Sequence, residues 1–123
     1  MRKILVTGGH GIIGRHAVAE LLARGMEVHA LGRHTERPAI LSKNIHWHQM
    51  DILSDDAQKI MQTIQPDMLL HLAWITEHGK FWNSPDNLNW VAASLKLVRA
   101  FAESGGKRLV VSGSCAEYDW QNL

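Results

Sequence analysis

The chain has 123 residues, of which 46% are hydrophobic, and a formal net charge of +1. Its length and apolar content are typical of one globular domain with a hydrophobic core, which excludes a disordered chain. The balanced charge, without a basic block, excludes nucleic-acid and membrane-surface binding from the expected functions. No apolar run approaches the roughly 20 residues that span a bilayer. One cysteine, Cys115, and no secretory signal at the N-terminus predict a cytoplasmic protein without an internal disulfide.

Strand and helix patterns alternate from the first residues onward. The short apolar run at 4–6 stops at glycines, as expected of a buried strand, and apolar residues at helical spacing follow from Ile13 until Gly25. Further along, the pattern predicts strands at 27–31, 45–50, 68–72 and 108–111, a helix capped by Ser54 and ended by Pro66, and a long helix at 86–104. Alternation of this kind predicts an α/β fold, a doubly wound parallel sheet of five strands in the order 3-2-1-4-5.

The long helix expected at 86–104 carries apolar residues on two stripes. The stripe expected to face the sheet consists of Leu88, Val91, Ala92, Leu95 and Ala102. The second stripe consists of Trp90, Leu97 and Phe101. A helix that is apolar on two sides is covered on two sides, so the second stripe is expected to meet either a partner chain or the loop at 75–84.

Residues 7–14, with the sequence TGGHGIIG, lie between the first expected strand and the first expected helix. Gly9, Gly11 and Gly14 give the spacing G-x-G-x-x-G at this strand-to-helix turn, where the backbone can approach a pyrophosphate and the helix N-terminus attracts it. This context predicts a Rossmann-type domain that binds NAD or NADP. The alternatives are a purely structural glycine turn and a loop for another phosphate ligand.

The end of the second strand bears on the choice between the two nucleotides. An NAD site usually has Asp or Glu there to bind the ribose 2′-hydroxyl, whereas this chain has Gly32, Arg33 and His34. The guanidinium of Arg33, helped by Arg15, is suited to a 2′-phosphate. We therefore expect NADP slightly in preference to NAD; the alternative is that both arginines are solvated surface charges.

Other candidate ligands have simpler interpretations. His46 and His48 are two residues apart on a strand and so share one face, where they could pair on a metal. No third ligand is apparent in the sequence, so we expect exposed polar residues and no metal site. His10 either contacts phosphate or faces solvent, and His71 is expected to be a hydrogen-bonded core histidine. Cys115 lacks a base partner and is expected to be an inert thiol.

Several segments occur in the order and spacing of a known family. They are TGGHGIIG, Met50-Asp51-Ile52, Pro66-Asp67, His71-Leu72-Ala73, Asn89, and Val111-Ser112-Gly113-Ser114 with Tyr118. Together they resemble the extended short-chain dehydrogenases/reductases, the NAD-dependent epimerase/dehydratase family, over essentially the whole chain. The resemblance implies an enzyme that oxidises, reduces or epimerises a nucleotide-linked sugar. It also implies a homodimer through the helix at 86–104.

The resemblance implies roles for single residues by matching position. The residues that would surround the pyrophosphate are Gly8, Gly11, Ile12, Ile13 and Gly14. Asp51 would accept a hydrogen bond from the adenine amino group, with Ile52 beside the ring. The residues that would line the path to the nicotinamide are Leu72, Ala73 and Trp74. Ser114 would be the catalytic hydroxyl that hydrogen-bonds the reacting substrate oxygen.

The chain also departs from the family pattern. Gly113 stands where the family often has Ser, and Ala92-Ala93 where it often has Gly-Thr. The larger departure is the catalytic Tyr-x-x-x-Lys pair: Tyr118 belongs to the preceding segment, and Asn122 stands four residues after it. We therefore expect residues 1–123 to be a single, truncated NAD(P)-binding domain, inactive alone, with the C-terminal strands and substrate subdomain absent. The alternative is a standalone NAD(P)-binding or redox-sensing module.

Overall fold

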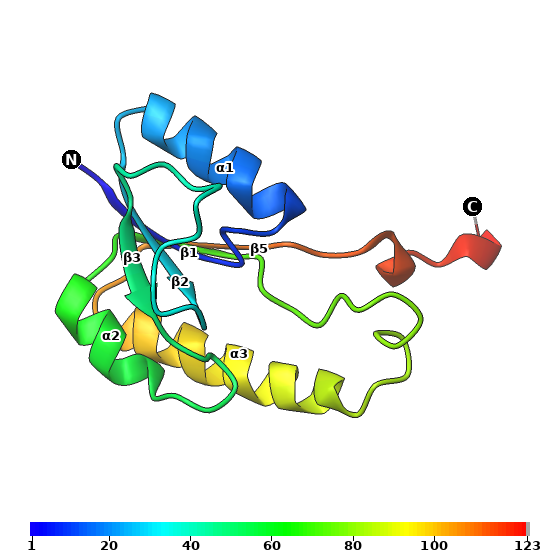
Figure 1. The fold of residues 1–123 in the computed structure, drawn as a ribbon. Helices are drawn as coiled ribbons and strands as arrows, with labels where there is room; N and C mark the ends of the chain where they lie inside the picture. Colours follow the sequence, from blue (N-terminus) through cyan, green and yellow to red (C-terminus); the bar gives the residue numbers. More distant parts are fainter. Residues whose placement is uncertain (123) are drawn as a thin grey trace.

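The structure is a computed structural model that describes residues 1–122 (Figure 1). Its strands are β1 (Lys3–Thr7), β2 (Glu27–Gly32), β3 (His46–Gln49), β4 (Met68–His71) and β5 (Arg108–Val111). Its helices are α1 (Ile12–Ala23), α2 (Ala57–Ile64) and α3 (Asp86–Glu103), followed by the short 3-10 turns η1 (Cys115–Glu117) and η2 (Trp120–Asn122). All neighbouring strands pair in parallel, in the order β3-β2-β1-β4-β5. The predicted fold class and strand order are confirmed.

The sheet is covered by helices on both faces, with α1 on one side and α2 and α3 on the other (Figure 1). Alternate residues of β1 explain this arrangement, because successive side chains of a strand point to opposite faces. Leu5 belongs to the apolar cluster that contains Met61 of α2 and Leu97 of α3. Val6 belongs to the cluster that contains Val18 of α1. Among residues 1–122, no helix combines the length and hydropathy that crossing a membrane requires.

The sequence-based assignment of the faces of α3 is wrong. The stripe expected to face the sheet is exposed along its whole length; it consists of Leu88, Val91, Ala92, Leu95 and Ala102. Instead, Leu97 and Phe101 of the second stripe are buried against the sheet and α2, while Trp90 is half-buried beside the ring of Trp74. Both stripes are apolar, so helical periodicity alone could not distinguish them.

The start of α2 also differs from expectation. Asp56, not Ser54, is the N-cap, and its carboxylate accepts a hydrogen bond from the Gln58 backbone N–H at 2.9 Å. Residues 51–54 instead form a turn, in which the Asp51 carboxylate accepts from the Leu53 backbone N–H at 3.0 Å. Aspartate side chains favour both arrangements, because they bond to backbone two residues further on.

Strand β5 lies at the edge of the sheet and pairs with β4 alone. All four of its residues are exposed, among them Leu109, Val110 and Val111. Beyond β5, the segment that contains η1 and η2 extends away from the sheet (Figure 1). This end of the sheet therefore presents an uncovered apolar surface.

Candidate functional site

The loop between β1 and α1 is held in its path by close backbone contacts. Gly8 has a φ of +68°, in the left-handed region, and a Cβ there would lie 2.9 Å from the Ala73 nitrogen. A Cβ on Gly14 would overlap the Gly8 carbonyl oxygen and lie 2.7 Å from the Gly9 Cα. Gly11 is different, because its added Cβ would meet only the Gly8 oxygen, at 3.4 Å. Gly8 and Gly14 are thus required by packing, whereas Gly11 faces open space.

Helix α1 begins directly after this loop, without a side-chain cap at Gly11. The first backbone N–H groups of a helix have no partner within it, and they carry a partial positive charge. Beside them, Ile12 is 76% exposed and Ile13 is 68% exposed. The loop therefore presents open amide donors between two apolar side chains, a surface suited to an anionic group attached to a larger ligand.

A cavity of about 640 Å³ adjoins the glycine loop at the carboxyl end of the sheet. The expected site residues that line it are Gly8, Arg33, Asp51, Ile52 and Ala73; Gly32, His10, Leu53 and Trp90 are also among the lining residues. Apart from Trp90, which lies on α3, they come from the carboxyl ends of four neighbouring strands, β1 to β4, and from the loops that follow them. In sheets of this order, the connections diverge between β1 and β4, which is where such folds bind ligands.

The remaining expected residues lie elsewhere. Gly11, Ile12, Ile13 and Gly14 form the loop and helix start beside the cavity. Leu72 packs against the apolar cluster on the α1 side of the sheet. Trp74 is turned toward α3, where its indole N–H donates to the Asn87 side chain at 2.7 Å and its ring lies 6.0 Å from that of Trp90. Trp90 is a cavity residue that the sequence did not identify.

Ser114 lines a second hollow, of about 570 Å³, together with Gly113, Cys115, Glu117 and Tyr118. Its hydroxyl accepts a hydrogen bond from the Ala116 N–H at 3.1 Å, and the Glu117 carboxylate accepts from the Ser114 N–H at 3.1 Å. This reciprocal pair is a capping box, which begins the turn η1. The structure does not bring Ser114 into the lining of the cavity beside the glycine loop.

A buried hydrogen-bond network holds the end of β1, where the glycine loop begins, against the end of β4. The Thr7 hydroxyl oxygen accepts from the backbone N–H groups of Leu72 at 3.0 Å and Ala73 at 3.1 Å, and the same hydroxyl lies 2.6 Å from His71 Nδ1. Because both lone pairs of the Thr7 oxygen are used, its hydrogen goes to His71 Nδ1. His71 Nε2 then carries the ring proton and donates to Ser94 at 2.8 Å. Burial lowers the pKa of His71 and favours this neutral form. The expected core histidine is confirmed.

Three basic side chains gather at one side of the cavity. Arg33 and His34 follow β2, and their backbone carbonyls accept hydrogen bonds from Gln49 at 3.3 Å and Trp47 at 2.9 Å. His10, from the glycine loop, has its ring 5.5 Å from that of His34. The pKa of His10 is lowered by its burial and further by the positive charges of His34 and Arg33. This arrangement favours an anion at the same place, since an anion relieves the repulsion.

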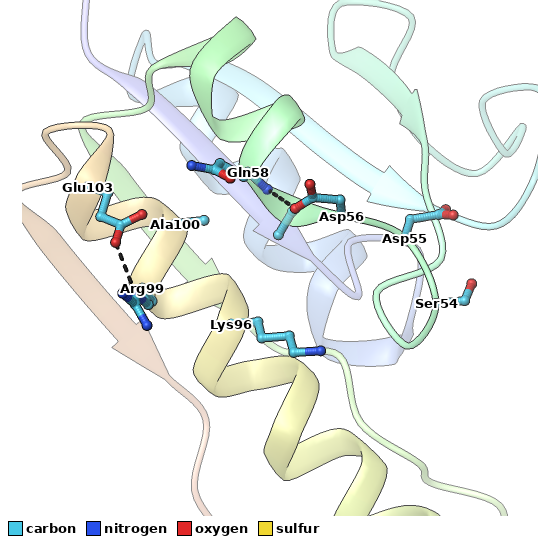
Figure 2. A pocket seen from close by; sticks show the side chains of 9 residues that line it. Ser54, Asp55, Asp56, Gln58, Lys96, Arg99, Ala100 and Glu103 are labelled. Atoms are coloured by element: carbon cyan, nitrogen blue, oxygen red, sulfur yellow. Dashed lines mark hydrogen bonds and ion pairs between the residues drawn. The ribbon is translucent and has the colours of Figure 1, made fainter.

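A third cavity, of about 570 Å³, lies between the start of α2 and the C-terminal half of α3 (Figure 2). Figure 2 shows that two of its polar side chains bond to near neighbours in the chain. Arg99 pairs with Glu103 at 3.0 Å, and the Asp56 carboxylate accepts a hydrogen bond from the Gln58 backbone N–H. The first is an exposed ion pair at helical spacing and the second is the N-cap of α2, and both are common local features of helices. We assign no function to this cavity.

The histidines of β2 and β3 are closer together than the sequence indicated. Glu27 and His29 of β2 lie beside His46 and His48 of β3, on one face of the sheet. His48 is half-buried, so the expectation of simply exposed strand residues is wrong for it. Burial lowers the pKa of both His29 and His48. The signal for this cluster was available, because the predicted strand order places β2 and β3 side by side.

Residues 4–122 match the NAD dependent epimerase/dehydratase family. The dTDP-6-deoxy-L-talose 4-dehydrogenase (NAD(+)) of Aggregatibacter actinomycetemcomitans is 33% identical over 116 residues, which cover 94% of this chain and 42% of that protein. UDP-glucose 4-epimerase 4 of Oryza sativa subsp. japonica is 34% identical over 133 residues, which cover 95% of this chain and 36% of that protein.

Among solved structures, that of the Bordetella bronchiseptica enzyme WbmH in complex with NAD+ resembles this chain with a TM-score of 0.73 and 25% identity. The similarity covers 89% of this chain and 38% of that one. The chain thus spans about two fifths of the length of the relatives it matches. The resemblance predicted from the sequence motifs is confirmed: this chain belongs to the NAD dependent epimerase/dehydratase family.

Proposed function

We propose that this chain is the NAD(P)-binding portion of a longer enzyme that epimerises, dehydrates, oxidises or reduces a nucleotide-linked sugar. The observation that carries the proposal is the glycine loop with its open α1 amides, set beside a cavity of about 640 Å³ at the carboxyl edge of the sheet. The names of the relatives, a dTDP-sugar dehydrogenase and a UDP-glucose epimerase, support the substrate class. The uncovered apolar surface of β5 supports a further part of the protein packing there.

The residues around the cavity fit a dinucleotide. The pyrophosphate would lie against Gly11, where a missing Cβ leaves open space, and against the amides of Ile12 and Ile13. Asp51 uses its Oδ1 atom to accept from Leu53, and within residues 1–122 its Oδ2 atom has no hydrogen-bond partner, so it can accept from the adenine amino group. Ile52 lines the cavity beside it and would pack on the ring.

When bound, the nicotinamide supplies hydride transfer. In the proposed enzyme, Leu72, Ala73 and Trp74 position that ring, and the hydroxyl of Ser114 orients the reacting oxygen of the sugar. Proton transfer requires an acid or base with a suitable pKa within hydrogen-bond reach, and serine alone is a poor one. We therefore propose that the chain as given binds the dinucleotide without turnover, because the Tyr-x-x-x-Lys pair is not in its sequence.

The alternative, from a different class, is a standalone NAD(P)-binding or redox-sensing module. The sequence that follows residue 123 in the gene distinguishes the two proposals, because an in-frame Tyr-x-x-x-Lys motif there would support the enzyme and not the standalone module.

We propose NADP in preference to NAD, and the side chain that carries this preference is Arg33. It lines the cavity with His34 and His10, and an added 2′-phosphate would pair with its guanidinium. Titration of the purified chain by calorimetry is expected to give tighter binding of NADPH than of NADH. Because Arg33 is exposed, Arg33→Ala should not disturb the fold. It is expected to lower the affinity for NADPH by about tenfold, which corresponds to one charge-assisted hydrogen bond, and to leave the affinity for NADH unchanged.

The matched control is Arg2→Ala, which removes another exposed arginine that does not line the cavity. Equal binding of NADH and NADPH, or an equal loss in both arginine variants, would contradict the role of Arg33 and leave the dinucleotide proposal intact. If a folded chain binds neither nucleotide, the proposed function itself is wrong for these residues.

We further propose a homodimer through α3. The support is the exposed apolar stripe on its outer face, where Leu88 is 75% exposed and Leu95 67% exposed. Isolated exposed apolar residues are common, but a continuous stripe from Leu88 through Val91 to Leu95, about two turns long, indicates a contact surface. Sedimentation velocity is expected to show a concentration-dependent dimer, and Leu95→Asp is expected to make the chain monomeric by burying a charge in the interface. Lys96→Asp is the control on the neighbouring position. A wild-type chain that is monomeric at every concentration contradicts this proposal.

A further inference from the structure

The amino ends of β2 and β3 bring three ligating side chains together. Glu27 and His29 project from β2, and His46, the first residue of β3, is in register with His29. One ligating atom from each of the three lies within 4.8 Å of the other two. The imidazole rings of His29 and His46 are stacked, with their centroids 4.6 Å apart. The sequence separates these residues, and only the pairing of β2 with β3 assembles them.

We propose that Glu27, His29 and His46 bind one divalent transition-metal ion of the zinc class, which joins the edge strand β3 to β2. Two imidazoles and one carboxylate are a ligand set that zinc accepts, with the fourth position taken by water. The two nitrogen donors disfavour calcium and magnesium, which prefer oxygen ligands.

The hydrogen bonds of His29 show how the ion would enter. In the metal-free protein the Glu27 carboxylate lies 2.8 Å from His29 Nε2. A carboxylate only accepts, so Nε2 carries the hydrogen, and the neutral ring accepts at Nδ1 from His48 Nε2, 2.9 Å away. The metal takes the place of the Nε2 proton between His29 and Glu27. That proton leaves to water, His29 Nδ1 takes the proton of His48 Nε2, and His48 takes one from water at Nδ1.

His48 is therefore a positioning residue. With the ion bound, His48 Nε2 accepts from His29 Nδ1, which fixes the orientation of the ligating ring. Metal-bound histidines commonly have such a partner at their second nitrogen. His48 is half-buried and its ring is nearly parallel to that of His29, with the centroids 5.2 Å apart, so it is held in the required place.

The geometry requires only a small adjustment. Zinc bonds of about 2.0–2.1 Å place tetrahedral ligand atoms roughly 3.4 Å apart. The Glu27 carboxylate, now 2.8 Å from His29 Nε2, must therefore move slightly away from it, and all three atoms already lie within 4.8 Å of one another. His46 is exposed and can turn its ring toward Glu27 without disturbing the core, while His29 is buried and stays fixed.

The proposed metal site is separate from the dinucleotide site. Glu27 begins β2, whereas Gly32 and Arg33 at its other end line the dinucleotide cavity. Five residues of strand correspond to about 16 Å. The metal proposal therefore does not rest on the proposed dinucleotide function, and the two can fail independently.

The test is calorimetric titration of the untagged, EDTA-treated chain with zinc chloride. We expect one zinc ion per chain and a higher Tm in its presence, because the ion binds the folded strands. His48→Ala is expected to lower the affinity for zinc by about 10- to 100-fold, and His46→Ala is expected to lower it by at least as much. His16→Ala, which removes an exposed histidine of α1, is the matched control and should bind as the wild type does.

Substitution of zinc by cobalt adds a spectroscopic signature, since a tetrahedral site with nitrogen ligands absorbs strongly in the visible range. Glu27→Gln keeps the size of the side chain and provides a second variant if His46→Ala does not fold. Unchanged zinc affinity in His46→Ala or in Glu27→Gln overturns the proposal. So does an equal loss in His16→Ala, or no binding by the wild-type chain. NADPH affinity, measured on the same samples, should not change in any of these variants.

Discussion

Gly14→Ala is expected to abolish measurable dinucleotide binding and to lower the thermal stability of the chain. The added Cβ would overlap the Gly8 carbonyl oxygen and lie 2.7 Å from the Gly9 Cα. Both obstacles are backbone atoms of a loop that Gly8, with its left-handed φ, holds against Ala73, so the loop must be displaced. Overpacking of this kind costs about 1–3 kcal/mol, which corresponds to a Tm lower by roughly 4 °C for each kcal/mol in a chain of this length. Displacement of the loop should also lower the affinity for NADPH by at least about 100-fold, or roughly 2.7 kcal/mol of binding free energy.

Gly11→Ala is the matched control for this prediction. Its Cβ would meet only the Gly8 oxygen, at 3.4 Å, which is an ordinary contact, and its φ of −72° suits alanine. Differential scanning calorimetry should therefore give a Tm close to that of the wild type. Calorimetric titration should still give weaker NADPH binding, because the methyl group points to the proposed pyrophosphate position. A Gly14→Ala chain with wild-type Tm and NADPH affinity would contradict the described packing of the loop.

Leu97→Ala is expected to lower the free energy of unfolding by about 2–5 kcal/mol, the usual cost of a cavity left by a buried leucine. Leu97 is fully buried, between the sheet and α2, within the same cluster as Leu5 and Met61. Domains of this size have only about 5–15 kcal/mol of stability in total. The variant should therefore unfold at a clearly lower urea concentration, measured by circular dichroism.

Leu95→Ala provides the comparison, since it makes the same chemical change two residues away on the exposed face of α3. At a dilution where the chain is monomeric, its unfolding free energy should remain within about 0.5 kcal/mol of the wild type. If Leu95→Ala proved the more damaging of the two, the outer stripe would face the sheet, as periodicity alone had predicted.

The sequence was sufficient for the fold because its signals agree with one another. The apolar run ending at Thr7, the glycines that follow, and the alternation of strands and helices all indicate the same parallel sheet. The faces of α3 could not be predicted in this way, since Leu95 and Leu97 are equally apolar and only the packing of α2 decides between them. Ser54 and Asp56 are both good caps, and the turn that Asp51 stabilises determines which of them is used.

The candidate site was predictable where backbone geometry defines it and less so where side chains from distant segments meet. Gly8, Asp51 and Ala73 follow strand ends, and parallel strands bring such residues to one edge. Trp90 was missed as a cavity residue because it reaches the cavity from α3, near the start of the helix, and not from the end of a strand. The cluster of Glu27 and His29 with His46 was missed because each strand was considered separately.

The single hydroxyl of Thr7 orders part of the site before a ligand binds. It accepts hydrogen bonds from Leu72 and Ala73, while the Gly8 that follows it rests against the Ala73 backbone. The segment after β1 and the segment after β4 are thereby fastened to each other, and neither can shift without breaking buried bonds. A ligand that touches both meets a surface already in its final shape. The entropy of ordering these two segments is lost during folding, and binding does not have to supply it again.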